Sequence, residues 1–539
     1  MSTPTDSAHA RRTDDPAAPG SWKDDLLSGF LVFLIALPLC LGISMASGFP
    51  AIAGIFTAVI GGLLTTWMGS APLTIKGPAA GLIVIALGAV TELGHGDLSL
   101  GYHRALAAIV VAGALQVAMA LLRAGSLGDF FPASVVHGML AAIGVIIFGK
   151  QVHVMLGVRP TATEPLHLLS EIPRSIAHMN PEIALIGASA LGLMFALPLV
   201  KNRWVRRVPA PLIALAVSVA LGRWFDLEHA HHYQLQAHDY TVGPAFLLQL
   251  PGSLVSAVTR PDFSGILSGL GFKYVVMFTL VGSIESLLSA KAVDTLDPWR
   301  RRSDLDKDLL ATGIGNMLCG LVGALPMISE IVRSSANVNN GGRTRRANFF
   351  HGGFLLLFVG AAPWLLARIP LAALAAMLVY TGARLASPKE FARSLQVGPE
   401  QALIFGVTFV GTLGVDILVG VAAGILVKAV VHTLAGLRLR QLFVPEMSVQ
   451  GEGDELTVRV LGAAVFTNIV SMRRRIDGLA ARRVTLDFSQ AQLVDHTVLE
   501  RLAEMRSAWI TENRELVVVG LNALRPVGRH PLAARRRYA

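Results

Sequence analysis

The sequence predicts an all-α polytopic membrane domain followed by a small cytoplasmic α/β domain. Three observations favour this fold class. Hydrophobic residues make up 53% of the 539 residues and charged residues only 15%, which is too apolar for a soluble protein. The apolar residues gather in two groups of seven segments, separated by a polar stretch. After about residue 438 the hydropathy falls, and a pattern typical of alternating strands and helices begins.

The apolar segments form two predicted repeats, at about residues 26–222 and 265–437. The first repeat contains segments at 26–47, 52–69, 78–93, 105–123, 133–150, 182–200 and 209–222. The second contains segments at 270–289, 308–324, 329–340, 350–367, 369–383, 401–413 and 417–437. Because each repeat has an odd number of segments, the two repeats cross the membrane in opposite directions. We therefore expect about 14 segments arranged as an inverted repeat.

The third segment of each repeat is short and interrupted by proline. The interruptions are residues 74–81, around Pro78, and residues 323–337, which contain Pro326 and continue into a polar run. Proline stops a helix, and the polar run can begin a half-helix whose free N–H groups and positive dipole end point at the break. Matching interruptions in two repeats are typical of a site at the membrane midplane, and free N–H groups are suited to anions.

Basic residues occupy the loops that share one side of the membrane. They are Arg11, Arg12, Lys23, Lys201, Arg203, Arg206, Arg207, Arg300, Arg301, Arg302, Arg343, Arg345, Arg346, Arg438 and Arg440. This positive-inside pattern predicts cytoplasmic N- and C-termini, and it accounts for the net charge of +10 without a nucleic-acid partner. Residues 1–22 are polar and predicted to be a disordered tail, which leaves residues 23–437 as the transmembrane domain.

The two cysteines, Cys40 and Cys319, both fall in apolar segments. A disulfide scaffold is therefore excluded, and no Cys/His constellation suitable for zinc is present in the sequence. We expect neither a resident metal nor a cofactor, and we expect that the chain is not an enzyme.

The C-terminal region, residues 440–539, has the pattern of a small α/β domain. Alternating apolar residues predict strands at 456–461, 483–488 and 515–521. Amphipathic patterns predict helices at 466–480 and 495–513.

Several of these segments resemble a known family. Residues 37–55 resemble the first-helix signature of the SulP anion-permease family. The interruption at 75–81 resembles its third segment, and Pro326 followed by Arg333 resembles its tenth. The C-terminal domain resembles a STAS domain through residues 486–489 and 494–497.

The resemblance covers about residues 24–520 and implies secondary-active transport of a small inorganic oxyanion, sulfate or bicarbonate, across a bacterial inner membrane. It implies a core domain of segments one to four and eight to eleven, and a gate domain of the rest. The resemblance further implies that the core slides against the gate like an elevator and that the STAS domain supports a homodimer. Similar bacterial chains are sometimes fused to or encoded near carbonic anhydrases, so such an enzyme is a candidate partner beside membrane lipid.

The resemblance places the substrate at the two interruptions. Arg333 is the strongest candidate, because its guanidinium offers a permanent charge and a planar fork to an oxyanion. The alternative is an arginine that reaches the cytoplasmic surface. Lys76 either attracts the anion or pairs with Glu330 or Glu285. Further candidate contacts are the backbone N–H groups of Ala79, Ala80 and Gly81 and the side chains of Ser329 and Ser334.

Two carboxylates are candidates for ion coupling. Glu285 lies in the middle of the eighth segment, with Ser289 one helical turn further on the same face. It either carries a proton, binds sodium together with Ser289, or is a structural partner of a basic residue. Glu330 either titrates with anion entry or forms a fixed ion pair with Lys76. Ile331 has no side-chain oxygen for sodium, which favours a proton over sodium without excluding either.

Four other functions are alternatives to a coupled oxyanion carrier. A passive anion exchanger or channel fits the same residues but predicts no steep dependence of uptake on an ion gradient. A dicarboxylate carrier of the same fold is a further alternative. A nucleobase carrier of similar architecture has no need of Arg333. A scaffold that acts through its STAS domain has no use for two matched interruptions. Thr497 takes the place of a phosphorylated serine in related STAS domains, but its neighbours His496 and Val498 favour a role in protein contacts.

Overall fold

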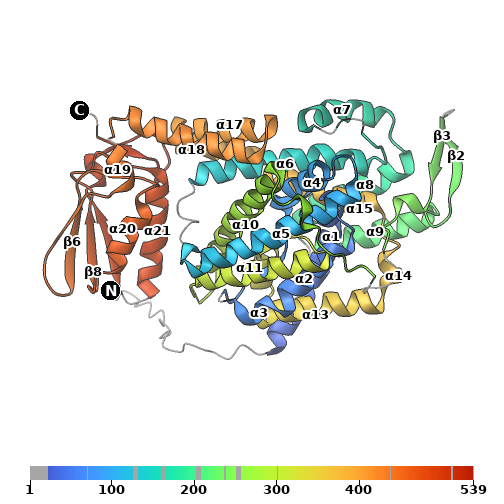
Figure 1. The fold of residues 1–539 in the computed structure, drawn as a ribbon, viewed down its shortest axis with the longest axis horizontal. Coiled ribbons are helices and arrows are strands. Elements are labelled where there is room, and N and C mark those ends of the chain that lie inside the picture. The colour runs from blue at the N-terminus through green and yellow to red at the C-terminus, as the bar shows by residue number, and fades with distance from the viewer. Residues whose placement is uncertain are drawn as a thin grey trace, which may run out of the picture.

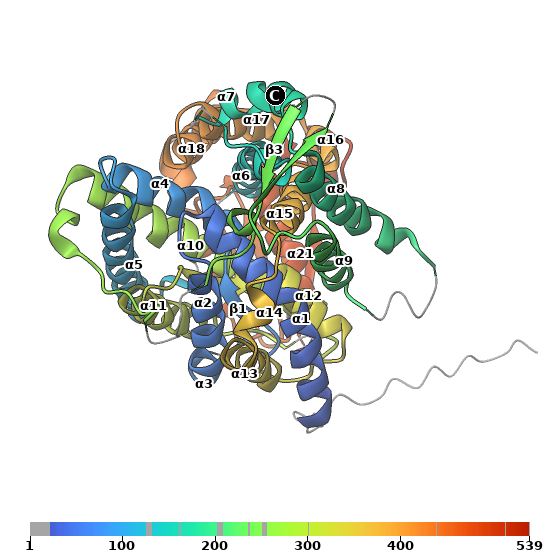
Figure 2. The same cartoon turned by 90° about the vertical axis from the view of Figure 1, so that its right-hand side faces the viewer.

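The computed structural model describes residues 22–537 apart from positions 70, 126–131, 161, 163, 202–207, 236–237, 251–255, 300, 438 and 512–513. The disordered tail expected at residues 1–22 therefore lies outside the described residues, except for Trp22, which begins the first helix. A large helical body and a C-terminal α/β domain lie side by side along the long axis of the molecule (Figure 1). In the view along this axis, the C-terminal domain lies behind the helical body (Figure 2).

Helices are found in every predicted apolar segment. The first repeat contains α1 (Trp22–Ala46), α2 (Ile52–Leu63), α3 (Thr65–Met68), α4 (Ile83–Leu93), α5 (Leu98–Leu121), α6 (Ala133–Met155), α8 (Pro181–Ala196) and α9 (Ala210–Trp224). The second contains α10 (Gly269–Leu296), α11 (Leu305–Val322), α12 (Ile331–Asn339), α13 (Arg346–Ala361), α14 (Pro363–Leu366), α15 (Leu371–Leu385), α17 (Pro399–Gly414) and α18 (Ile417–Leu434). Among the described residues, seven helices are long and apolar enough to cross a membrane on their own.

Some elements have no counterpart in the sequence prediction. Two amphipathic helices, α7 (Pro165–Ala177) and α16 (Pro388–Val397), connect longer helices. A hairpin of β2 (His231–Leu235) and β3 (His238–Val242) projects from the helical body at the end far from the C-terminal domain (Figure 1). This hairpin occupies part of the polar stretch between the repeats.

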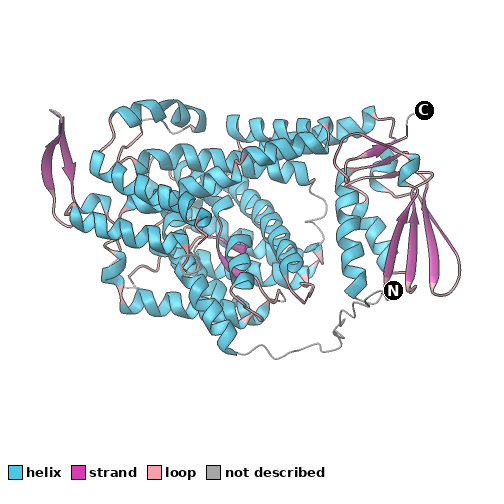
Figure 3. Ribbon diagram, turned by 180° about the vertical axis from the view of Figure 1, so that it is seen from behind, coloured by secondary structure: helices cyan, strands magenta, loops and turns pink. Residues whose placement is uncertain are grey.

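The two interruptions are short strands that pair with each other. Strand β1 (Ile75–Pro78) runs antiparallel to β4 (Met327–Glu330), with Lys76 opposite Ser329. Both strands lie inside the helical body (Figure 3). A single turn of 3-10 helix at Ala80–Leu82 joins β1 to α4, and β4 leads directly into α12. The pairing therefore brings the starts of two half-helices, one from each repeat, to the same place.

The helices pack in two groups. One group contains α1 to α5 and α10 to α13, where α5 packs on α11 and α13 packs on α1 and α2. The other contains α6, α8, α9, α15, α17 and α18, where α6 packs on both α15 and α17. In the first group α5 and α11 meet through Gly113 and Gly313. A Cβ at Gly313 would lie 2.8 Å from the carbonyl oxygen of Gly113, so only glycine permits this approach of two backbones.

The C-terminal domain contains two four-stranded sheets and two main helices. In the first sheet, β6 (Glu455–Val460), β8 (Arg483–Asp487) and β10 (Glu515–Val519) are parallel, and β5 (Met447–Gln450) pairs antiparallel with β6. The second sheet consists of β7 (Ala463–Ala464), β9 (Leu493–Val494), β12 (Arg535–Arg536) and β11 (Arg525–Pro526). Helices α20 (Ile469–Asp477) and α21 (His496–Thr511) close an apolar core that includes the buried Trp509. A short helix, α19 (Leu439–Phe443), leads into this domain.

A buried ion pair joins the last membrane helix to the C-terminal domain. Lys428 on α18 is fully buried, and its Nζ lies 3.0 Å from the Asp495 carboxylate and 2.8 Å from the Thr497 hydroxyl oxygen. Burial alone would raise the pKa of Asp495, but the Lys428 ammonium and the nearby His432 hold that pKa below its ordinary value. Arg536 and Glu400 form a second ion pair across the same junction. The Thr497 hydroxyl is thus enclosed in the contact between the domains.

Candidate functional site

Arg333 lies at the centre of the candidate site. It is in the first turn of α12 and is 0% exposed. Its Nη2 donates a long hydrogen bond of 3.4 Å to the carbonyl oxygen of Pro78, whereas its Nε and Nη1 have no hydrogen-bond partner. A buried guanidinium with unused donors is costly unless a ligand completes its hydrogen bonds. An arginine that reached the membrane surface would be exposed there, so the full burial of Arg333 excludes that alternative.

Gly77 provides the space that Arg333 occupies. A Cβ at position 77 would lie 2.1 Å from Nη1 of Arg333. Any side chain larger than hydrogen would therefore collide with the guanidinium. The glycine of β1 and the arginine of α12 fit together because the two strands are paired.

Glu285 reaches the same region from α10. Its Oε2 is buried without a hydrogen-bond partner, and a Cβ at Gly81 would lie 2.0 Å from its Oε1. The carboxyl group therefore packs against the turn that precedes α4. Ser289, one turn further along α10, is also buried. On the same helix, Ser286 accepts a hydrogen bond of 3.1 Å from the N–H of Ser329, a contact that the sequence did not reveal.

Glu330 is the residue that caps the start of α12 and ends β4. Its carboxylate lies near enough to the Arg333 guanidinium, the backbone N–H of Ala80 and the Glu285 carboxyl to feel their charges and dipoles. An anion at this place would be attracted by the same guanidinium and N–H group. Ala79 itself has an extended backbone, so the N–H groups that follow it begin the turn into α4.

Lys76 has a different partner from those considered in the sequence. Its Nζ lies 3.0 Å from the Asp308 carboxylate, 2.9 Å from the Thr312 hydroxyl and 3.1 Å from the Ser329 hydroxyl. Lys76 is 3% exposed and Asp308 is 0% exposed. The suggested pairing of Lys76 with Glu330 or Glu285 is therefore wrong. Lys76, in the first repeat, is therefore neutralised by Asp308 on α11 of the second repeat.

The hydroxyl groups of the two candidate serines are engaged within the protein. Ser329 donates to Asp308 at 3.0 Å, besides accepting from Lys76. Ser334 donates to the carbonyl oxygen of Glu330 at 2.5 Å and accepts from the N–H of Ile75 at 2.8 Å. Both serines tie β4 and α12 to their neighbours, so their hydroxyls fix the geometry around Arg333.

Sequence reasoning missed two buried polar residues. Asp308 stands near the start of an apolar helix, where an acidic residue usually faces water and stabilises the helix N-terminus. A signal was available in the sequence: Thr312, one helical turn after Asp308, places a hydroxyl on the same face of α11 and indicates that this face is polar. His351 on α13 is fully buried, and neither of its ring nitrogens has a hydrogen-bond partner. Its ring lies near enough to Arg333 to feel that charge.

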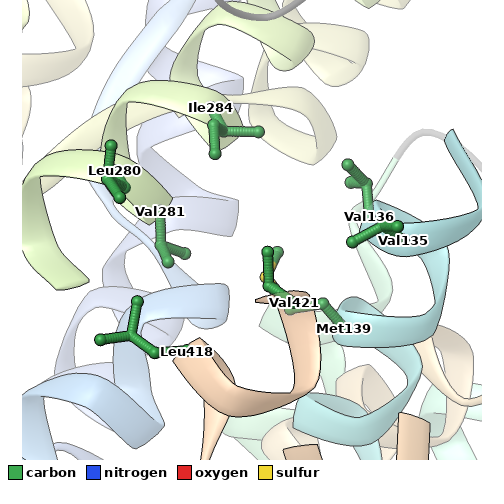
Figure 4. A pocket seen from close by; sticks show the side chains of 8 residues that line it. All are labelled: Val135, Val136, Met139, Leu280, Val281, Ile284, Leu418 and Val421. Carbon is green, nitrogen blue, oxygen red and sulfur yellow. The ribbon is translucent and has the colours of Figure 1, made fainter. Parts of the chain in front are cut away.

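An apolar cavity lies between the two groups of helices. Its lining side chains come from α6, α10 and α18, and they are Val135, Val136, Met139, Leu280, Val281, Ile284, Leu418 and Val421 (Figure 4). Ile284 immediately precedes Glu285 in the chain. The facing surfaces of α10, α6 and α18 are therefore apolar at this cavity.

Comparison with known proteins identifies the family. Residues 22–408 match the Sulfate permease family. The chain belongs to this family. One relative of this chain is a putative sulfate transporter of Bacillus subtilis, YvdB, which is 27% identical over 411 residues covering 76% of this chain and 73% of the relative. The bicarbonate transporter BicA of Synechocystis is 27% identical over 407 residues covering 75% of this chain and 68% of BicA.

Solved structures share the fold of this member of the family. The transmembrane domain of a cyanobacterial BicA has a TM-score of 0.60 at 24% identity, covering 75% of this chain and 97% of that chain. The murine anion transporter Slc26a9 in an inward-facing state has a TM-score of 0.64 at 15% identity, covering 92% of this chain and 85% of that chain. The predicted fold class, a helical membrane domain with a C-terminal STAS-type domain, is confirmed.

Proposed function

We propose that this protein transports a small inorganic oxyanion, sulfate or bicarbonate, across the bacterial inner membrane. The observation that carries the proposal is the pair of unused donors on the fully buried Arg333. They lie beside the starts of two half-helices, whose N–H groups and dipoles also attract an anion. Two relatives, whose names specify sulfate and bicarbonate transporters, support this class of substrate.

We propose an elevator-like movement for transport. Arg333, Glu285 and Glu330 all belong to the group of helices α1 to α5 and α10 to α13. The apolar cavity between α10 and the pair α6 and α18 supports sliding of this group against the other, because apolar surfaces move past one another without breaking hydrogen bonds. The substrate would travel with the moving group.

The place of Glu330 supports coupling to protons. Its carboxylate lies near enough to feel the Arg333 charge and the Ala80 N–H, both of which would also attract an anion. An ionised Glu330 therefore competes with the substrate, and a protonated Glu330 does not. We propose that a proton enters with the anion. Sodium bound by Glu285 and Ser289 is the second candidate for coupling, supported by a buried carboxylate oxygen of Glu285 that has no hydrogen-bond partner.

Uptake by proteoliposomes tests this function. Labelled sulfate and bicarbonate are offered under an inward pH gradient, an inward sodium gradient or no gradient, to the wild type and to Glu330→Gln. Uptake driven by the pH gradient in the wild type, and independent of it in Glu330→Gln, supports proton coupling. Sodium-driven uptake that survives the substitution makes Glu330 a structural residue, and gradient-independent uptake indicates a passive exchanger or channel. Glu504→Gln, at a partly exposed carboxylate of the C-terminal domain, serves as the control.

The assembly and orientation of the protein are proposed from the sequence. We propose a homodimer within membrane lipid, supported by the C-terminal domain, with both termini in the cytoplasm. Cross-linking in native membranes and protease access to the C-terminal domain in inside-out vesicles test these two points. A separate carbonic anhydrase is a candidate partner if bicarbonate is the substrate, and co-purification tests it.

A further inference from the structure

Five charged side chains surround the two paired strands, and their sum limits the charge of the substrate. They are Lys76, Asp308, Arg333, Glu285 and Glu330. Lys76 and Asp308 neutralise each other at 3.0 Å. The remaining three give one positive charge and two groups that are either negative or neutral. The formal charge of these five side chains is therefore +1 at most, and only when both glutamates are protonated; the starts of the two half-helices add partial positive charge for either anion.

Lys76 is engaged by three groups inside the protein. Its ammonium group donates to the Thr312 hydroxyl at 2.9 Å and to the Ser329 hydroxyl at 3.1 Å. It also forms an ion pair with the Asp308 carboxylate at 3.0 Å. Asp308 also accepts from Ser329 at 3.0 Å, so the pair is held on both sides. Lys76 is thus a fixed part of the contact between β1, β4 and α11 and adds no net charge to the site.

His351 does not change this sum. It is fully buried near Arg333, and neither ring nitrogen has a hydrogen-bond partner. A second buried cation beside the guanidinium would be opposed both by burial and by repulsion. The imidazole is therefore counted as neutral, and Arg333 is the permanent unneutralised cation among the described residues that line the two strands.

We infer that the site selects an oxyanion with a single negative charge, such as bicarbonate, over the doubly charged sulfate. This inference rests on the proposed transport function and specifies its substrate class. A monovalent anion neutralises the site when both glutamates carry protons. Sulfate would leave one negative charge that no charged side chain compensates, among buried groups where charges interact much more strongly than in water. Selectivity thus follows from Asp308, which acts by neutralising the Lys76 charge.

The test compares labelled bicarbonate with labelled sulfate in the same proteoliposomes, with protein-free vesicles as the measure of carbon dioxide leakage. We expect the wild type to prefer bicarbonate by at least about tenfold in kcat/KM, which corresponds to about 1.4 kcal/mol. Asp308→Asn removes the charge that neutralises Lys76 and raises the largest possible site charge by one unit. We expect it to shift the preference toward sulfate by at least about tenfold.

The double substitution Lys76→Gln with Asp308→Asn is the matched control. It removes both charges, so the site charge is that of the wild type, and we expect the wild-type preference for bicarbonate whatever the absolute rate. It also keeps the test informative if Asp308→Asn does not fold. Equal transport of sulfate and bicarbonate by the wild type overturns the inference while leaving the proposed function intact, as does a folded Asp308→Asn variant with unchanged preference. Transport of neither anion overturns the proposed function and the inference together.

Discussion

Replacing Gly77 by alanine should displace Arg333 without unfolding the protein. A Cβ at position 77 would lie 2.1 Å from Nη1 of Arg333, and its next contact is at 3.4 Å, to Cζ of the same side chain. Ordinary van der Waals separation is about 3.5 Å, so the guanidinium must retreat by about 1 to 1.5 Å. The colliding atom is the end of a flexible side chain, and the backbone of Gly77 is not in the left-handed region. The fold can therefore accept the methyl group while the site cannot.

The expected loss follows from the hydrogen bonds that Arg333 would make to an oxyanion. A charge-assisted hydrogen bond contributes about 1.5 to 3 kcal/mol, so losing one lowers anion affinity about 10- to 150-fold. Anion binding is measured on purified protein by a radioligand assay, and thermal unfolding is followed in parallel. Gly360→Ala is the matched control, because a Cβ there meets no atom within 4 Å. Unchanged anion affinity in a folded Gly77→Ala protein would refute the assignment of Arg333 to the site.

Other substitutions test the ion pairs and the helix contacts. Lys428→Met leaves the Asp495 carboxylate buried without its cation, so it should lower the free energy of unfolding by about 3 to 5 kcal/mol in denaturant titrations. Lys307→Met, at an exposed ion pair, should change this free energy by less than about 1 kcal/mol. The pKa of Asp495 is held below its ordinary value, so the ionised carboxylate stabilises the fold fully above about pH 4, and this contribution is lost as the pH falls through the lowered pKa. Tm measured against pH should show this loss in the wild type, and the Asp495→Asn variant should not show it. Gly313→Ala should cost about 1 to 3 kcal/mol, since its Cβ would meet the backbone of α5 at 2.8 Å, and an unchanged Tm would contradict that packing. Arg333→Lys keeps the charge but loses the planar fork, so anion affinity should fall at least about tenfold, and wild-type affinity would show that charge alone suffices.

The long helices could be predicted because their signal is local. An apolar run of about 20 residues specifies a membrane helix whatever surrounds it. The inverted repeat followed from the number of runs, and the place of the site followed from two prolines at matching positions. Whether Arg333, Glu285 and Glu330 bind substrate and coupling ions stays a prediction, although the structure brings the three residues together.

The strands β1 and β4 could not be predicted, because each has four residues and its partner lies about 250 residues away. The pairing of Lys76 with Asp308 could not be predicted for the same reason. No local sequence pattern distinguishes an acidic residue at a solvent-exposed helix start from one that is buried against the other repeat. In the C-terminal domain the longer strands β6, β8 and β10 were predicted, whereas two-residue strands such as β7 and β9 depend on their neighbours alone.

The contact of Lys428 with Asp495 and Thr497 limits how freely the two domains can be exchanged during evolution or engineering. A chimera that joins this membrane domain to the C-terminal domain of a relative would bury an ammonium group against whatever residue stands at the position of Asp495. Unless that residue is also a carboxylate, the graft should fail to dock even when both halves fold. The domains are separate in architecture, but they can be inherited as independent modules only if positions 428 and 495 change together.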